Sequence, residues 1–193
     1  MITSHRWAFL FITGIVSSAA SAASDINVTG IAITCNNCHG ENGVSAGGAM
    51  PSIGGQPGGY LESAMKEFRD GTRYSTAMGR LLKGYSDAEL AALAKYYERK
   101  LWIKAGQAEP AALVAKGSKL HSDRCAGCHG DKGDKTFEEM PRLAGQDTDF
   151  IEIELKKYAD KAVKVPSKVM RSMVKGLSPE DLHALAAFYG SQK

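Results

Sequence analysis

Several features typical of common function classes are absent from this sequence. We find no strand-rich stretch, and no Gly-x-Gly-x-x-Gly turn joins a strand to a helix, so the chain is not expected to bind a dinucleotide itself. No basic stripe interleaved with aromatic residues is present, which argues against nucleic-acid binding. Beyond the N-terminal region, no apolar run is long enough to cross a bilayer, so we expect no membrane span.

Cysteine is also scarce, with four among 193 residues, and all four lie in two copies of Cys-x-x-Cys-His. The copies are CNNCH at 35–39 and CAGCH at 125–129, each followed by glycine. This pentapeptide is the attachment signature of c-type haem: two thiols add to the porphyrin vinyl groups, and the adjacent histidine becomes the proximal iron ligand. We therefore predict two covalent haems. The predicted attachment cysteines are Cys35, Cys38, Cys125 and Cys128, and the predicted proximal iron ligands are His39 and His129.

Other uses of paired cysteines explain the pattern less well. The two pairs of a zinc ribbon usually stand about 15–20 residues apart, whereas these are separated by 125 − 35 = 90. A thioredoxin-like pair should lie near a βαβ pattern, which we do not find. A disulfide within each pair is compatible with an oxidising compartment, but it leaves the following histidine unexplained.

The N-terminus has the organisation of a secretory signal peptide. A short polar region at His5-Arg6 precedes an apolar stretch from Trp7 to Val16, and Ala20-Ser21-Ala22 resembles a cleavage site. We predict a signal peptide over residues 1–23, cleaved near Ala22 to Ser24, and export to the periplasm of a bacterium. A buried N-terminal helix is the alternative.

The sequence repeats itself. Residues 50–56 (MPSIGGQ) match 140–146 (MPRLAGQ) at an offset of 140 − 50 = 90, and residues 78–90 match 170–182 at 170 − 78 = 92. A repeat with one haem motif per copy predicts tandem domains. The predicted domains are 24–103 and 104–193, joined by a linker near Lys100 to Glu109.

Each copy is expected to be all-α and wrapped around its haem. Helices are predicted over Tyr60 to Asp70, Ala111 to Arg124 and Asp149 to Asp160. Ser86 and Ser178 each precede acidic residues and an amphipathic stripe, which predicts N-caps of the last helix in each domain.

A methionine from each copy is the expected sixth iron ligand. Met78 and Met170 correspond between the repeats, and we place both in a loop before the last helix, 78 − 39 = 39 and 170 − 129 = 41 residues after the motif histidines. His/Met ligation gives a closed electron-transfer centre. A core methionine that fills a gap is the alternative for each. Weaker candidates for this role are Met50, Met65, Met140, Met173, His121 and His183, and the two histidines are expected to be surface or packing residues.

Taken together, the haem motifs, methionine segments and Gly-Gln blocks resemble the dihaem class I cytochromes c. The Gly-Gln blocks are typical of the cytochrome c4 group. Three other runs resemble the cytochrome subunit of flavocytochrome c sulfide dehydrogenase more closely: MGRLLKGYS at 78–86, SKLH at 118–121 and AFYGSQ at 187–192. The resemblance also implies that the carbonyls of Pro51 and Pro141 accept hydrogen bonds from the motif histidines.

That resemblance implies an electron-transfer subunit without a substrate site of its own. Sulfide would be oxidised on a separate flavoprotein subunit that binds FAD, and this chain would pass the electrons to a downstream cytochrome or oxidase. The alternative is a free-standing cytochrome c4-type carrier that feeds a terminal oxidase. A haem enzyme with an open iron is disfavoured by the two matched methionines. The lysine-rich segment at 156–175 is a candidate docking edge for an acidic acceptor, or simply a solvated face.

Overall fold

The computed structural model describes residues 26–193, so the predicted signal peptide and its cleavage site lie outside the described residues. This part of the chain folds into helices and loops, with a single β-bridge between Phe137 and Met140. The all-α prediction is therefore confirmed. The first half contains α1 (Val28–His39), η1 (Glu41–Gly43), α2 (Gly58–Asp70), α3 (Met78–Leu81), η2 (Leu82–Gly84) and α4 (Asp87–Glu98). The second half contains α5 (Ala111–Arg124), α6 (Ala126–His129), α7 (Thr148–Ala159), α8 (Lys168–Val174) and α9 (Pro179–Gly190).

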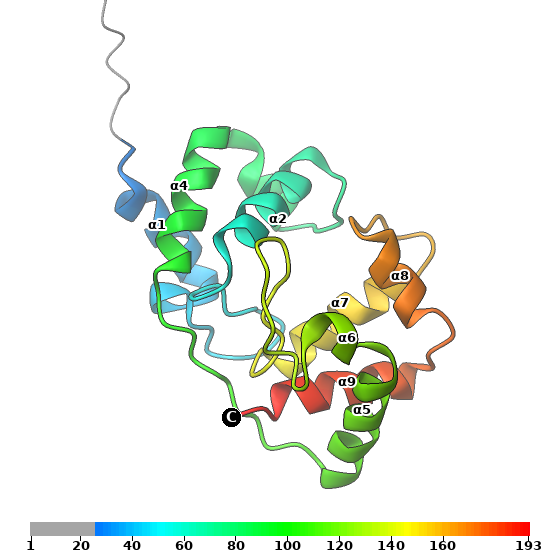
Figure 1. Ribbon diagram of the computed structural model, residues 1–193. Coiled ribbons are helices and arrows are strands. Elements are labelled where there is room, and N and C mark those ends of the chain that lie inside the picture. The colour runs from blue at the N-terminus through cyan, green and yellow to red at the C-terminus, as the bar shows by residue number, and fades with distance from the viewer. Residues whose placement is uncertain (1–25) are drawn as a thin grey trace, which may run out of the picture.

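The two halves form two groups of helices, with α1, α2 and α4 in one and α5 to α9 in the other (Figure 1). The predicted helices before the second motif and in the middle of each half lie within two residues of their expected ends. Both predicted serine caps are present as capping boxes, Ser86 with Glu89 and Ser178 with Asp181. None of the helices within residues 26–193 has the length and apolar character that a membrane crossing requires.

The core of the first half is built from α1, α2 and α4. Ala32, Leu61, Leu93 and Ala94 pack together there with Tyr97. The Tyr97 hydroxyl lies 3.1 Å from the Ala32 carbonyl and 2.8 Å from Asn36 Oδ1, so the last helix is bonded to the helix that carries the first motif.

The second half has a corresponding core, in which α5 crosses α9 closely. Gly117 permits the approach, because a Cβ atom there would lie 1.9 Å from the Ala184 carbonyl oxygen. Beyond the crossing, the His121 ring lies 5.0 Å from the Phe188 ring and 5.4 Å from the Tyr189 ring, centre to centre. Apolar residues of α7 and α9 complete this core, including Ile151, Leu155, Leu182 and Leu185.

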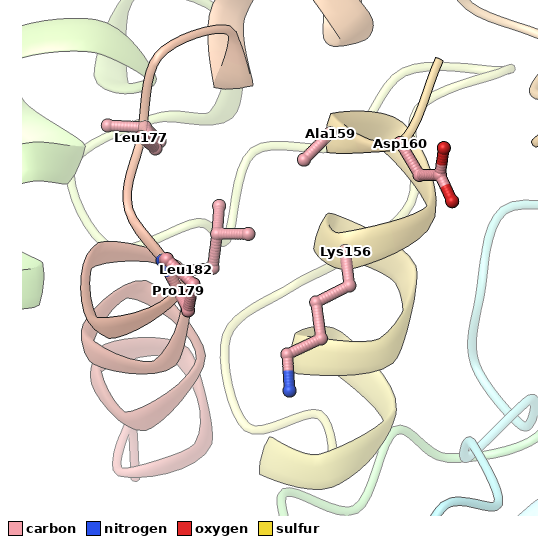
Figure 2. A pocket seen from close by; sticks show the side chains of 6 residues that line it. All are labelled: Lys156, Ala159, Asp160, Leu177, Pro179 and Leu182. Atoms are coloured by element: carbon pink, nitrogen blue, oxygen red, sulfur yellow. The ribbon is translucent and has the colours of Figure 1, made fainter. Parts of the chain in front are cut away.

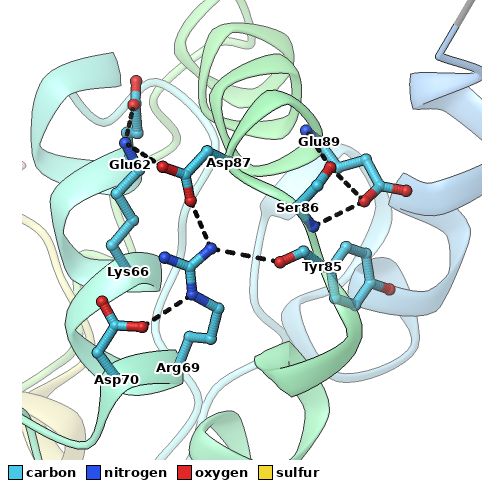
Figure 3. Close-up of polar contacts among 8 residues, drawn as sticks. All are labelled: Glu62, Lys66, Arg69, Asp70, Tyr85, Ser86, Asp87 and Glu89. Atoms are coloured by element: carbon cyan, nitrogen blue, oxygen red, sulfur yellow. Dashed lines mark hydrogen bonds and ion pairs between the residues drawn. The ribbon is translucent and has the colours of Figure 1, made fainter.

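Polar contacts tie each methionine segment to the helix that precedes it. Arg69, near the end of α2, pairs with Asp87 at the start of α4 and donates a hydrogen bond to the Tyr85 carbonyl at 3.3 Å (Figure 3). In the second half, Arg171 of α8 donates to the carbonyls of Asp160 and Val163. Each methionine segment is therefore tied to the end of the helix that precedes it.

The segment between the halves packs along the second half. The Trp102 indole donates to the Ala144 carbonyl at 3.1 Å, and the Gln107 amide donates to the Gly190 carbonyl at 3.0 Å. The predicted linker contains no helix or strand and is hydrogen-bonded to the second half.

Candidate functional site

The first motif lies on one continuous helix. Cys35, Cys38 and His39 belong to the last turns of α1, with Cys35 half-buried, Cys38 exposed and His39 buried. Gly40 follows with φ +76°, and a Cβ atom there would lie 1.8 Å from the Val44 carbonyl oxygen. A glycine after the histidine is therefore required for the chain to turn sharply out of the helix.

The imidazole of His39 is held in one tautomer. Its Nδ1 lies 2.9 Å from the Pro51 carbonyl, which can only accept, so the N–H donates and the lone pair remains on Nε2. Burial lowers the pKa of His39, against an opposing effect of the Pro51 carbonyl. The ring is neutral at pH 7 with a free nitrogen lone pair, which is the form that ligates iron. The expected Pro51 hydrogen bond is present.

The second motif is built differently. Its helix is interrupted at Cys125, which has φ −117°, and the remaining turn, α6, ends at His129. Cys125 is half-buried, Cys128 is exposed and His129 is buried. The Nδ1 atom of His129 is buried without a hydrogen-bond partner among the described residues, so the expected bond to the Pro141 carbonyl is not formed.

The second half has a buried histidine, His121, on the helix before the motif. His121 Nε2 lies 2.6 Å from the Gly130 carbonyl and must donate to it, so Nδ1 accepts from the Tyr189 hydroxyl at 2.9 Å. His121 is thus a packing residue, as expected, but its hydrogen bonds were not foreseen. The corresponding residue of the first half is Ile31, which cannot form them.

The two methionines occupy equivalent places, but in short helices rather than in the loops that we predicted. Met78 begins α3 and Met170 lies inside α8. The amide of each donates to a serine three residues earlier, Ser75 at 3.2 Å and Ser167 at 3.1 Å. Ser167 is the N-cap of α8, and its oxygen satisfies an amide of the first turn, whereas Ser75 lies two residues before Ala77, the N-cap of α3. Met170 and Cys125 pack against the same core cluster.

The chemistry of these residues fits covalent haem. None of the four cysteines forms a disulfide, so each thiol is available for thioether attachment. Apolar side chains beside the two methionines are left outside the cores, with Leu81 exposed by 42%, Val169 by 66% and Met173 by 40%. A flat apolar cofactor would cover such surfaces. Among residues 26–193, no group of three or more His, Cys, Asp or Glu side chains is placed to hold a metal ion without a macrocycle.

Two pockets formed by the described residues do not include the predicted haem ligands. One, of about 340 Å³, is lined by the facing ends of α7 and α9 (Figure 2). Its walls are mainly apolar, with Lys156 and Asp160 at the side of α7. A groove of about 800 Å³ runs between the loop after α2 and the loop after α7. None of the predicted haem ligands lines either of them.

Two helical domains, each with a Cys-x-x-Cys-His motif that ends in a buried histidine, define a dihaem c-type cytochrome. Comparison with known proteins agrees: cytochrome c4 of Azotobacter vinelandii is 30% identical over 93% of this chain and 92% of its own length. The chain belongs to the dihaem cytochrome c4 family and carries two covalent c-type haems. Residues 112–188 also match the family described as cytochrome c oxidase, cbb3-type, subunit III.

The solved structure of reduced cytochrome c4 from Pseudomonas stutzeri superposes with a TM-score of 0.77 at 25% identity, covering 86% of this chain and 97% of that one. Two further relatives are named for sulfur oxidation. The cytochrome subunit of sulfide dehydrogenase from Chlorobaculum tepidum is 40% identical over 35% of this chain and 60% of its own length. A thiosulfate dehydrogenase electron acceptor from Thiomonas intermedia is 32% identical over 67% of this chain and 64% of its own length.

Proposed function

We propose that this chain is a periplasmic electron carrier in which Cys35 and Cys38 attach one haem and Cys125 and Cys128 attach the other. His39 and Met78 would be the axial ligands of the first iron, and His129 and Met170 those of the second. The hydrogen bond from Nδ1 of the buried His39 ring to the Pro51 carbonyl, which leaves Nε2 to ligate iron, is the observation that carries the proposal. Bound haem supplies the one-electron couple, and the protein supplies ligation, burial and a docking face.

The axial assignments are tested by substitution. Met78→Ala and Met170→Ala should each remove about half of the weak sulfur-to-iron absorption band and leave one haem low-spin, because each methionine would ligate one iron. Met65→Leu is the matched control, since Met65 packs against the core of the first half. Loss of the band in the Met65 variant, or its retention in both alanine variants, would contradict the assignments.

As the donor, we propose a flavoprotein sulfide dehydrogenase, with this chain as its cytochrome subunit. Support comes from the three runs at 78–86, 118–121 and 187–192 and from the relative named as a sulfide dehydrogenase subunit. The chain would have no substrate site of its own and would deliver electrons to a downstream cytochrome or oxidase. A free-standing cytochrome c4-type carrier that feeds a terminal oxidase is the second candidate, supported by the similarity over the whole chain.

Gentle purification of the native protein distinguishes these candidates. A larger species with flavin absorbance that is bleached by sulfide would establish the subunit. A protein of the mass of the processed chain, without flavin and not reduced by sulfide, would favour the free carrier. Reduction through a thiosulfate-oxidising enzyme instead would contradict the proposed flavoprotein donor while leaving electron transfer intact.

A further inference from the structure

The two Gly-Gln blocks meet at the contact between the domains. Gln146 Oε1 accepts from the Ser52 amide and its Nε2 donates to the Ser52 carbonyl, both at 2.9 Å. Gln56 makes the same pair of bonds with Arg142, at 2.8 and 3.0 Å. Gln56 and Gln146 are buried, at 3% and 2% exposure, and both partners obey the offset of 90 (146 − 56 and 142 − 52). The repeat therefore forms a pseudo-twofold clasp between the domains.

One peptide unit of this clasp also contacts the first motif. The amide N–H of Ser52 and the carbonyl of Pro51 belong to the same peptide group. The N–H donates to Gln146 of the second domain, whereas the carbonyl accepts from the His39 ring at 2.9 Å. Hydrogen bonds arranged in such a chain polarise one another, so the acceptor on the N–H strengthens the carbonyl as an acceptor.

The equivalent chain on the other side is incomplete. The Arg142 N–H donates to Gln56, but within the described residues the Pro141 carbonyl receives no bond from His129, whose Nδ1 is buried without a partner. The glutamine bonds of the clasp are symmetric, but in the described part of the chain a hydrogen bond links the clasp to the motif histidine only in the first domain. Gln146 Oε1 also accepts from the amide of Asp147 at 3.0 Å, which orients the side chain.

We propose that Gln146 is a positioning residue that acts across the domain contact and strengthens the hydrogen bond donated by His39. This inference rests on the proposed role of His39 as an axial ligand. A stronger bond at Nδ1 makes the imidazole a better electron donor and stabilises the ferric state. The second domain would thereby lower the reduction potential of the haem in the first domain.

The test compares Gln146→Met with Gln56→Met in the full holoprotein. Both remove two hydrogen bonds between the domains, but only Gln146 is connected to His39. Potentials are measured by electrochemical titration, and the ring N–H of each motif histidine is followed by NMR after ¹⁵N-histidine labelling. We expect Gln146→Met to raise the potential of the haem in the first domain and to shift the His39 ring N–H signal. Gln56→Met should leave that signal in place.

A conservative substitution gives a second measurement. Gln146→Glu keeps an oxygen that accepts from Ser52, so the potential of the first haem should not rise. Equal shifts from both methionine variants would show general loosening of the contact and overturn the inference, as would an unchanged His39 signal in Gln146→Met. If the unaltered ferric protein shows no haem-induced shift of the His39 ring, the proposed ligation fails instead, so the two failures are distinguishable.

Discussion

His121 shows how one residue makes the two haem domains different. It occupies the place of Ile31 on the helix that leads into the motif, and it hydrogen-bonds both the Gly130 carbonyl and the Tyr189 hydroxyl. His121→Ile would leave the buried Tyr189 hydroxyl and the half-buried Gly130 carbonyl without this partner. We expect the free energy of unfolding to fall by about 1–3 kcal/mol, measured by denaturant titration of the ferric protein.

A surface histidine is the control for this prediction. His183 pairs with Glu152 at 2.8 Å, and its side chain is 42% exposed. Surface changes usually alter stability by less than about 0.5 kcal/mol, so His183→Gln should have little effect. If His121→Ile were as stable as the unaltered protein, the two hydrogen bonds of His121 would not contribute as argued.

At the scale of single residues, the sequence predicts the candidate haem residues better than it predicts the hydrogen bonds around them. Motif spacing predicts the helical placement of His39, and family resemblance predicts its bond to Pro51. The same reasoning is wrong for Pro141, because ring orientation depends on how the surrounding loop packs. The bonds of His121 are likewise not predicted from sequence. Its bond to Tyr189 depends on the crossing of α5 and α9, and its bond to Gly130 depends on how the chain turns back after α6.

At the scale of elements, the start of α9 predicts how stability responds to acid. Asp181 accepts a hydrogen bond from the Ser178 amide and pairs with Lys116, and these contacts lower its pKa from 3.8 to about 2. Because the pKa is depressed in the folded state, the stabilisation is complete above the ordinary value and is lost as pH falls towards the folded one.

Asp181→Asn should therefore be less stable than the unaltered protein at neutral pH, and the difference should shrink between about pH 4 and about pH 2. Thermal unfolding of both proteins across this range measures it. Asp131→Asn is the control, because Asp131 is exposed and has no hydrogen bond or ion pair among the described residues. A stability difference for Asp181→Asn that stays constant down to pH 2 would refute the argument.

Helix ends of this kind can be predicted from sequence, because a cap is a local interaction of four residues. Both capping boxes were predicted, and the structure contains both. The helical turns at Met78 and Met170 were missed. Their serines stand three residues before the methionines, but α3 has only four residues and α8 only seven. Such short turns lack the apolar periodicity by which longer helices are recognised.

At the scale of the whole molecule, the repeat indicates two domains but not how they meet. The Gly-Gln blocks were recognised as equivalent, whereas their pairing across the domain contact was not. A glutamine side chain that bonds to backbone 94 residues away leaves no periodic signal in a single sequence. The contact also includes Arg73, which is buried between Glu67 of its own domain and Glu154 of the other, at 3.5 and 3.9 Å.

Basic side chains from both domains lie around the groove between them. Within the lysine-rich segment, Lys156 and Lys157 pair with glutamates of their own helix, and Arg171 bonds backbone carbonyls. Lys164 and Lys168 have no ion pair among the described residues. Lys164 also lines the groove between the domains. On the opposite wall of that groove, the first domain contributes Arg80 and Lys83.

An acidic acceptor would therefore be steered towards this edge. Replacing Lys164 and Lys168 by glutamate should slow reduction of such an acceptor about tenfold or more at low salt, because steering accelerates encounter by that order. Stopped-flow mixing with an acidic cytochrome measures the rate, and the difference should fade as salt screens the charges. Glutamate at Lys95 and Lys119 changes net charge equally on α4 and α5 and should have a smaller effect. Equal slowing by both pairs would show that net charge, not this edge, governs the encounter.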